Sequence, residues 1–503
     1  MIISLKELYK RFNQYEEFYD SFPVQKSSTM ALIYRDYSNR DLNIDKIISD
    51  LEPIDYKIKS GIGELYLGSL DVQPKSVGYR LELLRLILDS MSEDFFQTIS
   101  IDKESILGIS YSIYLYYLVL QTNSFSNHKL NDSEKKYLLI SQDFSFTIND
   151  IRMVRGNTDE KSFDTYISLF CTDIADLKKN DAACLFSDDN RYFVFCLQDF
   201  ADYIIYEIER LYRSICTRSN VDLYTKNKGE LFERYVLGIA SAINRDCFHT
   251  LYYYPNDHQK MELDIVIRDD TNIAIFECKS GTINTAGIDE DNVIRLQILN
   301  KTKKAYKTLK TVSDYMNSNK NYRFVGEEVN LEGTMNNVFL IHVSMYSMDY
   351  IASNLHALFP EYYNNSNPIL SISLEHLLAI ILDVKDKNTN IFDYWNKRKE
   401  YINKHPGMYY DNNELDLYYE IIHDKSMLNE LNASGVLDQF DSNCKIISTF
   451  RNQFGKEIRP ATELINNVES LMLGRIIRYG KTWYGINRRF LKFLDGYLRV
   501  EQS

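Results

Sequence analysis

The sequence predicts an α/β core, in which helices flank a mixed sheet, between largely α-helical N- and C-terminal regions. Two observations support this prediction. Two short apolar runs, Met261 to Ile267 and Ile273 to Lys279, are joined by a turn-like stretch, which is typical of a β-hairpin. Around the hairpin, apolar residues recur at helical spacing, and more apolar runs of strand length follow. This mixture of strands and helices is typical of a sheet that packs against helices.

The length of the chain predicts more than one domain. At 503 residues the chain exceeds what one hydrophobic core usually organises, and we expect three domains: 1–220, 221–385 and 386–503. The seven cysteines form no Cys-x-x-Cys pair, so neither a zinc site nor a disulfide framework is expected, and a reduced cytoplasm fits best. The first ten residues lack the pattern of a signal peptide.

The region 1–220 reads as mostly helical, with a short strand at Arg191 to Cys196 and no catalytic constellation. We expect it to serve as a sensor, a substrate-selecting platform or an oligomerisation module. Its uncharged stretch from Ser105 to Asn127 contains the strongly apolar run Ile106 to Leu120. That run is shorter than the roughly 20 apolar residues of a membrane span and contains serines and tyrosines, so it predicts a buried helix.

An amphipathic helix is predicted just before the hairpin, from Asn227 to Asn244, with one apolar stripe. Asn227 and Glu230 resemble a capping pair, which gives Glu230 a structural explanation. Glu233 falls at the edge of the apolar stripe instead. We therefore favour Glu233 as an additional ligand of a metal or water; the alternative is a plain solvated glutamate.

The register of the hairpin follows from its loop. If Asp269 to Asn272 form a four-residue loop, opposed residues have numbers that add up to 541. Asp264 then faces Glu277, and Glu262 faces Lys279. Because side chains alternate along a strand, one face of the hairpin is expected to be core and the other to carry charge. The charged face would hold Glu262, Asp264, Val266, Ile275, Glu277 and Lys279, and the other Leu263, Ile265, Ile267, Ala274, Phe276 and Cys278.

Two opposed carboxylates with a lysine beside them predict a metal-dependent phosphodiesterase site. Cross-strand Cβ atoms lie about 4.5–5.5 Å apart, so Asp264 and Glu277 would be close enough to share a cation. Mg²⁺ prefers carboxylate oxygen and retains waters that can become the nucleophile. The alternative is a surface hairpin with incidental charges. An acid, any residue and a lysine also occur at 134–136, 176–178 and 383–385, but there no Asp-bearing strand precedes them.

These residues resemble a known superfamily. The helix with Gly229 to Arg234, then the run Leu-Asp-Ile-Val at 263–266 and Ile-Phe-Glu-Cys-Lys at 275–279 resemble the PD-(D/E)xK nucleases, most closely their Holliday-junction resolvase and Mrr-like branches. The resemblance covers about 120–160 residues from about Val221 and implies a restriction-endonuclease-like fold. It implies that Asp264, Glu277 and the Cys278 carbonyl bind divalent metal. Lys279 would support the attacking water and the transition state. The Pro-Asp of the superfamily name is Leu263-Asp264 here.

Two further groups of residues complete the predicted site. Glu262 either pairs with Lys279 and orients it, or takes part in outer-shell metal binding. A helix is predicted from Asp291 to Tyr315, and related nucleases often carry a glutamine there, so Gln297 is a candidate for positioning DNA or water; a solvated helix face is the alternative. The lysines of this helix would contact phosphates without reading sequence: Lys301, Lys303, Lys304, Lys307 and Lys310. Strands at 337–344 and 368–373 and a helix at 374–382 should follow.

The net charge of −13 argues against a uniformly basic nucleic-acid binder but not against a nuclease, because a metal and a local basic groove can attract phosphate. The stretch from Arg475 to Lys492 has six basic residues, no acids and interleaved aromatics. It predicts either a surface that follows a nucleic-acid strand or a helix that packs its aromatics inward.

The function that these features predict is a nuclease that depends on Mg²⁺, which Mn²⁺ can replace. Its expected substrate is DNA, its expected role is in restriction or anti-phage defence, and the expected localisation is cytoplasmic, without a membrane. A homo-oligomer or a partner protein of a defence system would fit. An RNA- or junction-specific nuclease of the same superfamily is one alternative. A non-catalytic subunit that uses a nuclease fold to bind nucleic acid is the other.

Overall fold

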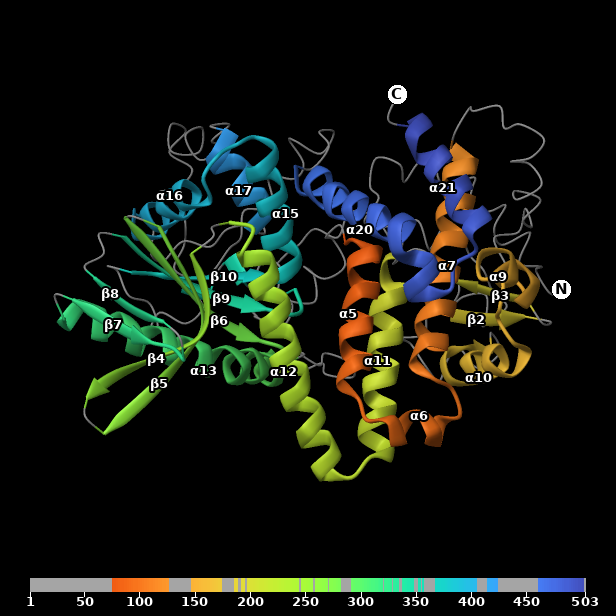
Figure 1. Ribbon diagram of the computed structural model, residues 1–503, viewed down its shortest axis with the longest axis horizontal. Coiled ribbons are helices and arrows are strands. Elements are labelled where there is room, and N and C mark those ends of the chain that lie inside the picture. Colours follow the sequence, from red (N-terminus) through yellow and green to blue (C-terminus); the bar gives the residue numbers. More distant parts are fainter. Residues whose placement is uncertain are drawn as a thin grey trace. The chain divides into compact units, whose positions relative to one another are not determined.

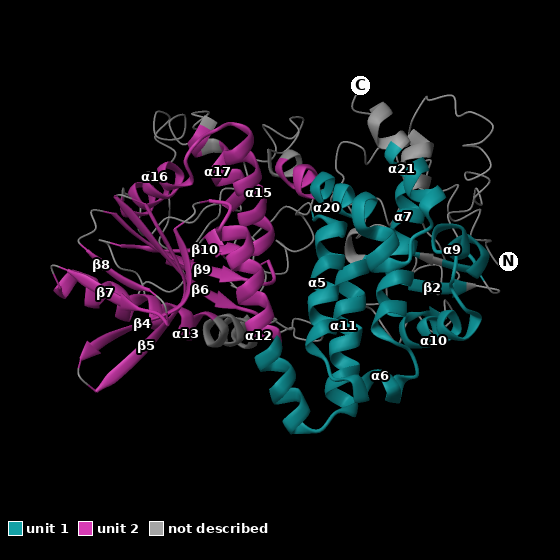
Figure 2. Cartoon of the chain, in the orientation of Figure 1, with its two compact units in different colours: residues 1–53, 74–227, 469–503 teal, residues 54–73, 228–468 magenta. Residues whose placement is uncertain are grey.

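The computed structural model describes residues 75–125, 146–173, 185–404, 414–423 and 460–501, with short gaps between 185 and 404, the longest of them 282–290 and 357–366. The chain forms two compact units (Figure 2). The first includes Pro74–Asn227 and Glu469–Ser503, and the second includes Lys228–Val468. The division into three domains stays a prediction; the described residues after 386 are shared between the two units.

The first unit is mainly helical, with a small three-stranded sheet in the order β1-β2-β3 (Figure 1). Its central helix is α7, whose residues Ile106 to Tyr117 are buried, as predicted for the apolar run. The predicted strand at Arg191 is β3. The elements are α5 (Val77–Ser90), α6 (Glu93–Ile99), α7 (Lys103–Phe125), α9 (Ile148–Val154), α10 (Glu160–Phe170), β1 (Thr172–Asp173), β2 (Leu185–Asp188), β3 (Arg191–Val194), α11 (Leu197–Ile215), the first part of α12 (Arg218–Ala240), most of α20 (Pro460–Tyr484), and α21 (Arg488–Glu501).

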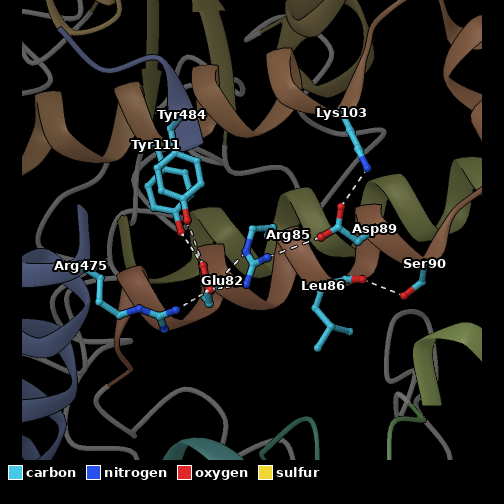
Figure 3. Close-up of polar contacts among 9 residues, drawn as sticks. All are labelled: Glu82, Arg85, Leu86, Asp89, Ser90, Lys103, Tyr111, Arg475 and Tyr484. Carbon is cyan, nitrogen blue, oxygen red and sulfur yellow. Dashed lines mark hydrogen bonds and ion pairs between the residues drawn. The ribbon is translucent and has the colours of Figure 1, made fainter. Parts of the chain in front are cut away.

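A buried carboxylate joins α20 to the N-terminal helices of this unit. Glu82 on α5 is 4% exposed and accepts hydrogen bonds from Arg85 at 2.6 Å and from the Tyr484 hydroxyl at 3.0 Å. Figure 3 shows Arg475 approaching the same carboxylate, at 3.4 Å. Burial alone would raise the pKa of Glu82, but the two arginines outweigh burial and the pKa is lowered. The glutamate therefore stays charged and fixes the C-terminal half of α20 against α5.

The second unit contains a mixed seven-stranded sheet in the order β10-β9-β6-β5-β4-β7-β8. Strands β6, β9 and β10 run parallel to one another, and the remaining pairs are antiparallel. The predicted strands at 337–344 and 368–373 and the helix after them are present as β9, β10 and α15. The elements are β4 (Cys247–Asn256), β5 (Gln259–Arg268), β6 (Asn272–Lys279), α13 (Asp291–Ser318), β7 (Tyr322–Val325), β8 (Asn330–Gly333), β9 (Asn337–Ser344), β10 (Ile369–Ser373), α15 (Leu374–Asp386), α16 (Ile391–Lys404) and α17 (Glu414–His423).

Helices cover both faces of the sheet, which is the predicted α/β architecture. On one face, Ile275 of β6 packs in a core cluster with Leu309 and Val312 of α13. On the other face, Phe276 packs edge-on against Trp395 of α16, with ring centroids 5.9 Å apart. Residues Asn272 to Cys278 are consequently all buried. The expectation of one core face and one charged face is therefore wrong for β6, because a central strand between two helical layers is buried on both sides.

The helix that precedes the sheet is longer than its sequence pattern predicts. α12 begins at Arg218 rather than at Asn227, so Asn227 lies within the helix and does not cap it. The capping explanation for Glu230 is therefore wrong. The added turns at 218–226 have few apolar residues, so their helical pattern is weak in the sequence. Within the described parts of the chain, none of the helices combines the length and the apolar character that a membrane crossing requires.

Candidate functional site

The hairpin of β5 and β6 has the predicted register. The pairs run from Arg268 and Ile273 to Ile265 and Phe276, and the numbers of each pair add up to 541. Asp269 makes the turn, because its Oδ1 atom accepts the backbone N–H groups of Thr271 at 2.9 Å and Asn272 at 2.6 Å. The loop geometry therefore fixes which residues of the two strands meet.

Asp264 and Glu277 come next in this register, one residue beyond the last ladder pair, Ile265 and Phe276. The Asp264 Oδ2 atom accepts the backbone N–H of Cys278 at 2.7 Å, which ties the carboxylate to the partner strand. Glu277 is 5% exposed, and burial together with the Asp264 charge raises its pKa to about 7. Burial also raises the pKa of Asp264, against the opposing effects of the Lys279 charge and the Cys278 N–H. Two carboxylates in one buried place repel each other, and a cation between them would relieve that repulsion.

Lys279 supplies the positive charge of this pair. Its Nζ atom lies 2.5 Å from Glu277 Oε1 and 3.1 Å from the Cys278 carbonyl oxygen. Burial lowers the pKa of Lys279, but the charges of Glu277 and Asp264 outweigh burial and the pKa is raised. Lys279 is thus a charged ammonium held at the two acids.

Glu262 does not take the predicted place opposite Lys279. Before Asp264, β5 pairs with β4 but not with β6, and Glu262 lies opposite Tyr252, exposed to solvent. The register partner of Lys279 is Ser344 on β9. Leu263, assigned by alternation to the face opposite Val266, joins the same core cluster as Val266. The prediction of a shared face for Glu262 and Asp264 is therefore wrong, because alternation is interrupted at Asp264.

Glu233 on α12 approaches the hairpin, whereas Glu230 is exposed. Burial raises the pKa of Glu233 to about 7, and the charges of Asp264 and Glu262 add to that effect, with Lys279 opposing it. Glu233 is therefore a third carboxylate close enough to Asp264 for their charges to interact. Glu233 is thus half-buried and Glu230 exposed, as the helical pattern predicts, even though α12 starts earlier than expected. Below, "the acidic site" means Glu233, Asp264, Glu277 and Lys279.

His249 and Thr250 on β4 belong to the same neighbourhood and were not singled out in the sequence. His249 Nε2 lies 3.6 Å from Glu233 Oε2, and the Thr250 hydroxyl lies 2.8 Å from His249 Nδ1. Thr250 has a φ of 54°, in the left-handed region that a β-branched residue rarely adopts. Its register position is opposite Asp264, between the pairs His249–Ile265 and Leu251–Leu263. No local sequence pattern indicates this bend.

His342 on β9 is a second residue that the sequence analysis missed. It is the register neighbour of Glu277, is 1% exposed, and shares a 2.8 Å hydrogen bond through Nδ1 with Ser371 of β10. Burial, with a contribution from the Lys279 charge, lowers its pKa to about 3, so the imidazole is neutral. The sequence feature that could have indicated His342 is a histidine inside the otherwise apolar run 337–344.

Helix α13 contributes Lys304, an exposed residue whose charge lowers the pKa of both Asp264 and Glu277. Lys303, Lys307 and Lys310 are also exposed on this helix. Gln297 lies in α13 two turns before Lys304, but its side chain is outside the described residues, as is that of Lys301. The predicted roles of Gln297 stay predictions.

The donor set of the acidic site fits Mg²⁺. Within the described ranges, no group of three or more His, Cys, Asp and Glu side chains is already arranged around a common metal position. Mg²⁺ does not require such a group, because it is commonly held by one or two carboxylates and completed by water. Asp264 and Glu277 would hold the ion, with the Cys278 carbonyl oxygen and Glu233 as the remaining candidates. Burial and the charge of Asp264 raise the pKa of Glu277, and a bound cation would offset both effects.

Residues 228–331 match the model of a family described as a domain of unknown function (DUF4143). The matched segment contains all four members of the acidic site, as well as His249, Thr250 and Lys304. No curated protein and no solved structure matches the chain. The family match therefore covers the acidic site without assigning it an activity.

Proposed function

We propose that this protein is a Mg²⁺-dependent nuclease of the PD-(D/E)xK type, with a restriction-endonuclease-like core and DNA as its substrate. One observation carries the proposal: a half-buried carboxylate and a buried one on adjacent strands, Asp264 and Glu277, lie with the ammonium of Lys279. A third carboxylate, Glu233, approaches from a helix. A purely structural hairpin would gain nothing from burying two acids together, because the repulsion costs stability.

Each residue has a distinct task in this proposal. Asp264 and Glu277 hold the metal, and Glu233 and the Cys278 carbonyl oxygen help. When bound, Mg²⁺ supplies an acidified water and neutralises the scissile phosphate. Lys279 stabilises the negative charge that develops on the phosphate during attack. The exposed lysines of α13 contact phosphates. A role in restriction or anti-phage defence is part of the proposal.

The test is a cleavage assay with Mg²⁺ or EDTA on duplex, single-stranded and branched DNA and on RNA. Asp264→Asn, Glu277→Gln and Lys279→Met should each lower the rate by about 100-fold or more, because each removes a charge that acts in the transition state. Glu332→Gln is the matched control, since Glu332 is an exposed acid on β8 with 62% of its side chain accessible. Undiminished cleavage by all three folded variants would contradict the site, and preference for RNA would correct the substrate.

A further inference from the structure

The C-terminal part of α20 carries a stripe of arginine and aromatic side chains that is partly exposed at Arg475 and Tyr479 and exposed at Trp483. Arg475, Tyr479 and Trp483 follow one another at four-residue spacing, so they lie along one side of the helix, and exposed Arg478 lies next to them. Trp483 is 41% exposed and Leu471, on the same side, is 38% exposed. The sequence left two explanations for this segment, and inward packing accounts for Tyr484 and Phe490, which are 3% and 1% exposed. It does not account for Trp483.

Ring contacts hold Trp483 in place. Its indole stacks on Tyr479, with centroids 4.4 Å apart and planes 17° apart, and meets the edge of Tyr484 at 6.1 Å. The Arg475 guanidinium lies 5.8 Å from the Trp483 ring centroid and also pairs with the buried Glu82. Figure 3 shows this arginine reaching Glu82 from α20. The exposed part of the indole is therefore presented by a fixed helix rather than by a flexible loop.

The segment that contains Trp483 is basic in sequence. No acid occurs between Arg475 and Lys492, although the whole chain has a net charge of −13. Beyond the stripe, the exposed basic residues are Lys481 on α20 and Arg488, Arg489 and Lys492 on α21. α21 packs on the end of α20, because a Cβ atom on Gly480 would meet Leu491 at 3.4 Å. Ring contacts link Arg475, Arg478, Tyr479 and Trp483, and we call these four residues, with the exposed basic residues Arg488, Arg489 and Lys492 that follow on α21, the basic-aromatic surface.

We infer that the basic-aromatic surface binds single-stranded nucleic acid, with an unpaired base stacked on Trp483 and phosphates on the arginines. A basic surface alone attracts any polyanion, but a rigid exposed aromatic adds affinity only for a ligand with a free planar face. The bases of a duplex are stacked on one another and do not present such a face. An acidic peptide would satisfy the charges without using the indole. This inference rests on the proposed nuclease function, because it names the form of nucleic acid that the nuclease would hold. The binding itself does not require the acidic site.

Intrinsic tryptophan fluorescence gives a direct test, because the chain has only two tryptophans and Trp395 is 2% exposed. In EDTA, where Mg²⁺-dependent cleavage cannot occur, a single-stranded oligonucleotide should quench the emission of the full-length protein. Heparin, a polyanion without bases, should quench much less. Trp483→Leu should abolish the quenching and weaken binding, measured by anisotropy of a labelled oligonucleotide, by roughly 5- to 100-fold. Trp483→Phe should retain most of the affinity.

Charge variants separate stacking from phosphate contact. Arg478→Glu and Arg489→Glu should each weaken binding and flatten its dependence on salt. Arg213→Glu, an exposed arginine on α11 of the same unit, is the matched control and should leave binding unchanged. No quenching by any oligonucleotide, or equal binding of heparin and oligonucleotide by wild type and Trp483→Leu, would overturn the inference. Loss of cleavage in Asp264→Asn tests the nuclease proposal separately, because that variant should bind the oligonucleotide normally.

Discussion

Thr250 on β4 lies at the register position opposite Asp264 on β5, and its backbone has a φ of 54°. The ladder pairs on either side, His249 with Ile265 and Leu251 with Leu263, are intact. A β-branched residue held in a left-handed conformation inside a strand costs about 1–3 kcal/mol and persists only where the surroundings impose it. The bend coincides with the place where the alternation of β5 is interrupted and with the carboxylate that we propose as a metal ligand.

Replacement of Thr250 by glycine should therefore increase stability and decrease activity. Glycine adopts a positive φ without a steric cost, so we expect a gain of about 1 kcal/mol in the free energy of unfolding, measured with urea. The hydroxyl that contacts His249 Nδ1 is lost. Because His249 lies 3.6 Å from Glu233, a member of the acidic site, cleavage should fall. The same exchange at Thr98, an exposed residue of α6, should destabilise the protein slightly, because glycine has a lower helix propensity than threonine. A loss of stability in Thr250→Gly would show that the conformation is not strained.

Glu233 should lower the free energy of unfolding of the metal-free protein at alkaline pH. Its pKa is raised to about 7, so the folded state disfavours the charged form. The resulting penalty is absent below the ordinary pKa of about 4.5, grows as the pH rises, and is complete above about pH 7. Glu233→Gln in EDTA should thus raise the free energy of unfolding at pH 8 by about 1–3 kcal/mol and change it little at pH 4.5. Glu230→Gln, an exposed neighbour on α12, should change stability much less.

Binding of Mg²⁺ should release protons near neutral pH. Glu233 and Glu277 both have a pKa of about 7 without metal, and a ligating carboxylate must be ionised. At pH 6.5 the observed heat of Mg²⁺ binding should consequently depend on the ionisation enthalpy of the buffer, and at pH 9 this dependence should vanish. Titration calorimetry in two buffers of equal pH measures the number of protons. The same cause predicts that cleavage increases between about pH 6 and pH 8. Buffer-independent heats at pH 6.5 would argue against ligation by either glutamate.

Lys304 should influence the acidic site from α13, unlike its neighbour Lys303. Both are exposed, but it is the charge of Lys304 that acts on Asp264 and Glu277, where it partly offsets the larger effect of burial that raises their pKa. Lys304→Glu should raise the pKa of both acids further and move the rise of the pH–rate profile to higher pH. Lys303→Glu carries the same change of charge and is the matched control. Equal shifts in the two variants would mean that only the net charge of the helix matters.

The short-range features of the site could be predicted from the sequence by itself. The turn residues Asp269 to Asn272 set the register, and register brought Asp264 beside Glu277 without any knowledge of the fold. The helical stripe of α12 distinguished Glu233 from Glu230 for the same reason, since both inferences depend on periods of local structure. The division into a sheet covered by helices followed from the alternation of those periods.

Only the tertiary structure decided what lies around these residues. The pairing of β5 with β6 ends at Ile265, whereas its pairing with β4 continues past Glu262, so Glu262 does not face Lys279; where the ladder ends depends on the whole sheet. His342 reaches the site through β9, a strand distant in sequence, and His249 lies next to a backbone bend with no sequence pattern. Likewise, the charge pattern of 475–492 could not tell Trp483 from Tyr484. Burial of one and exposure of the other follow from the packing of α20 on Glu82 and Tyr111, a long-range contact that no local period encodes.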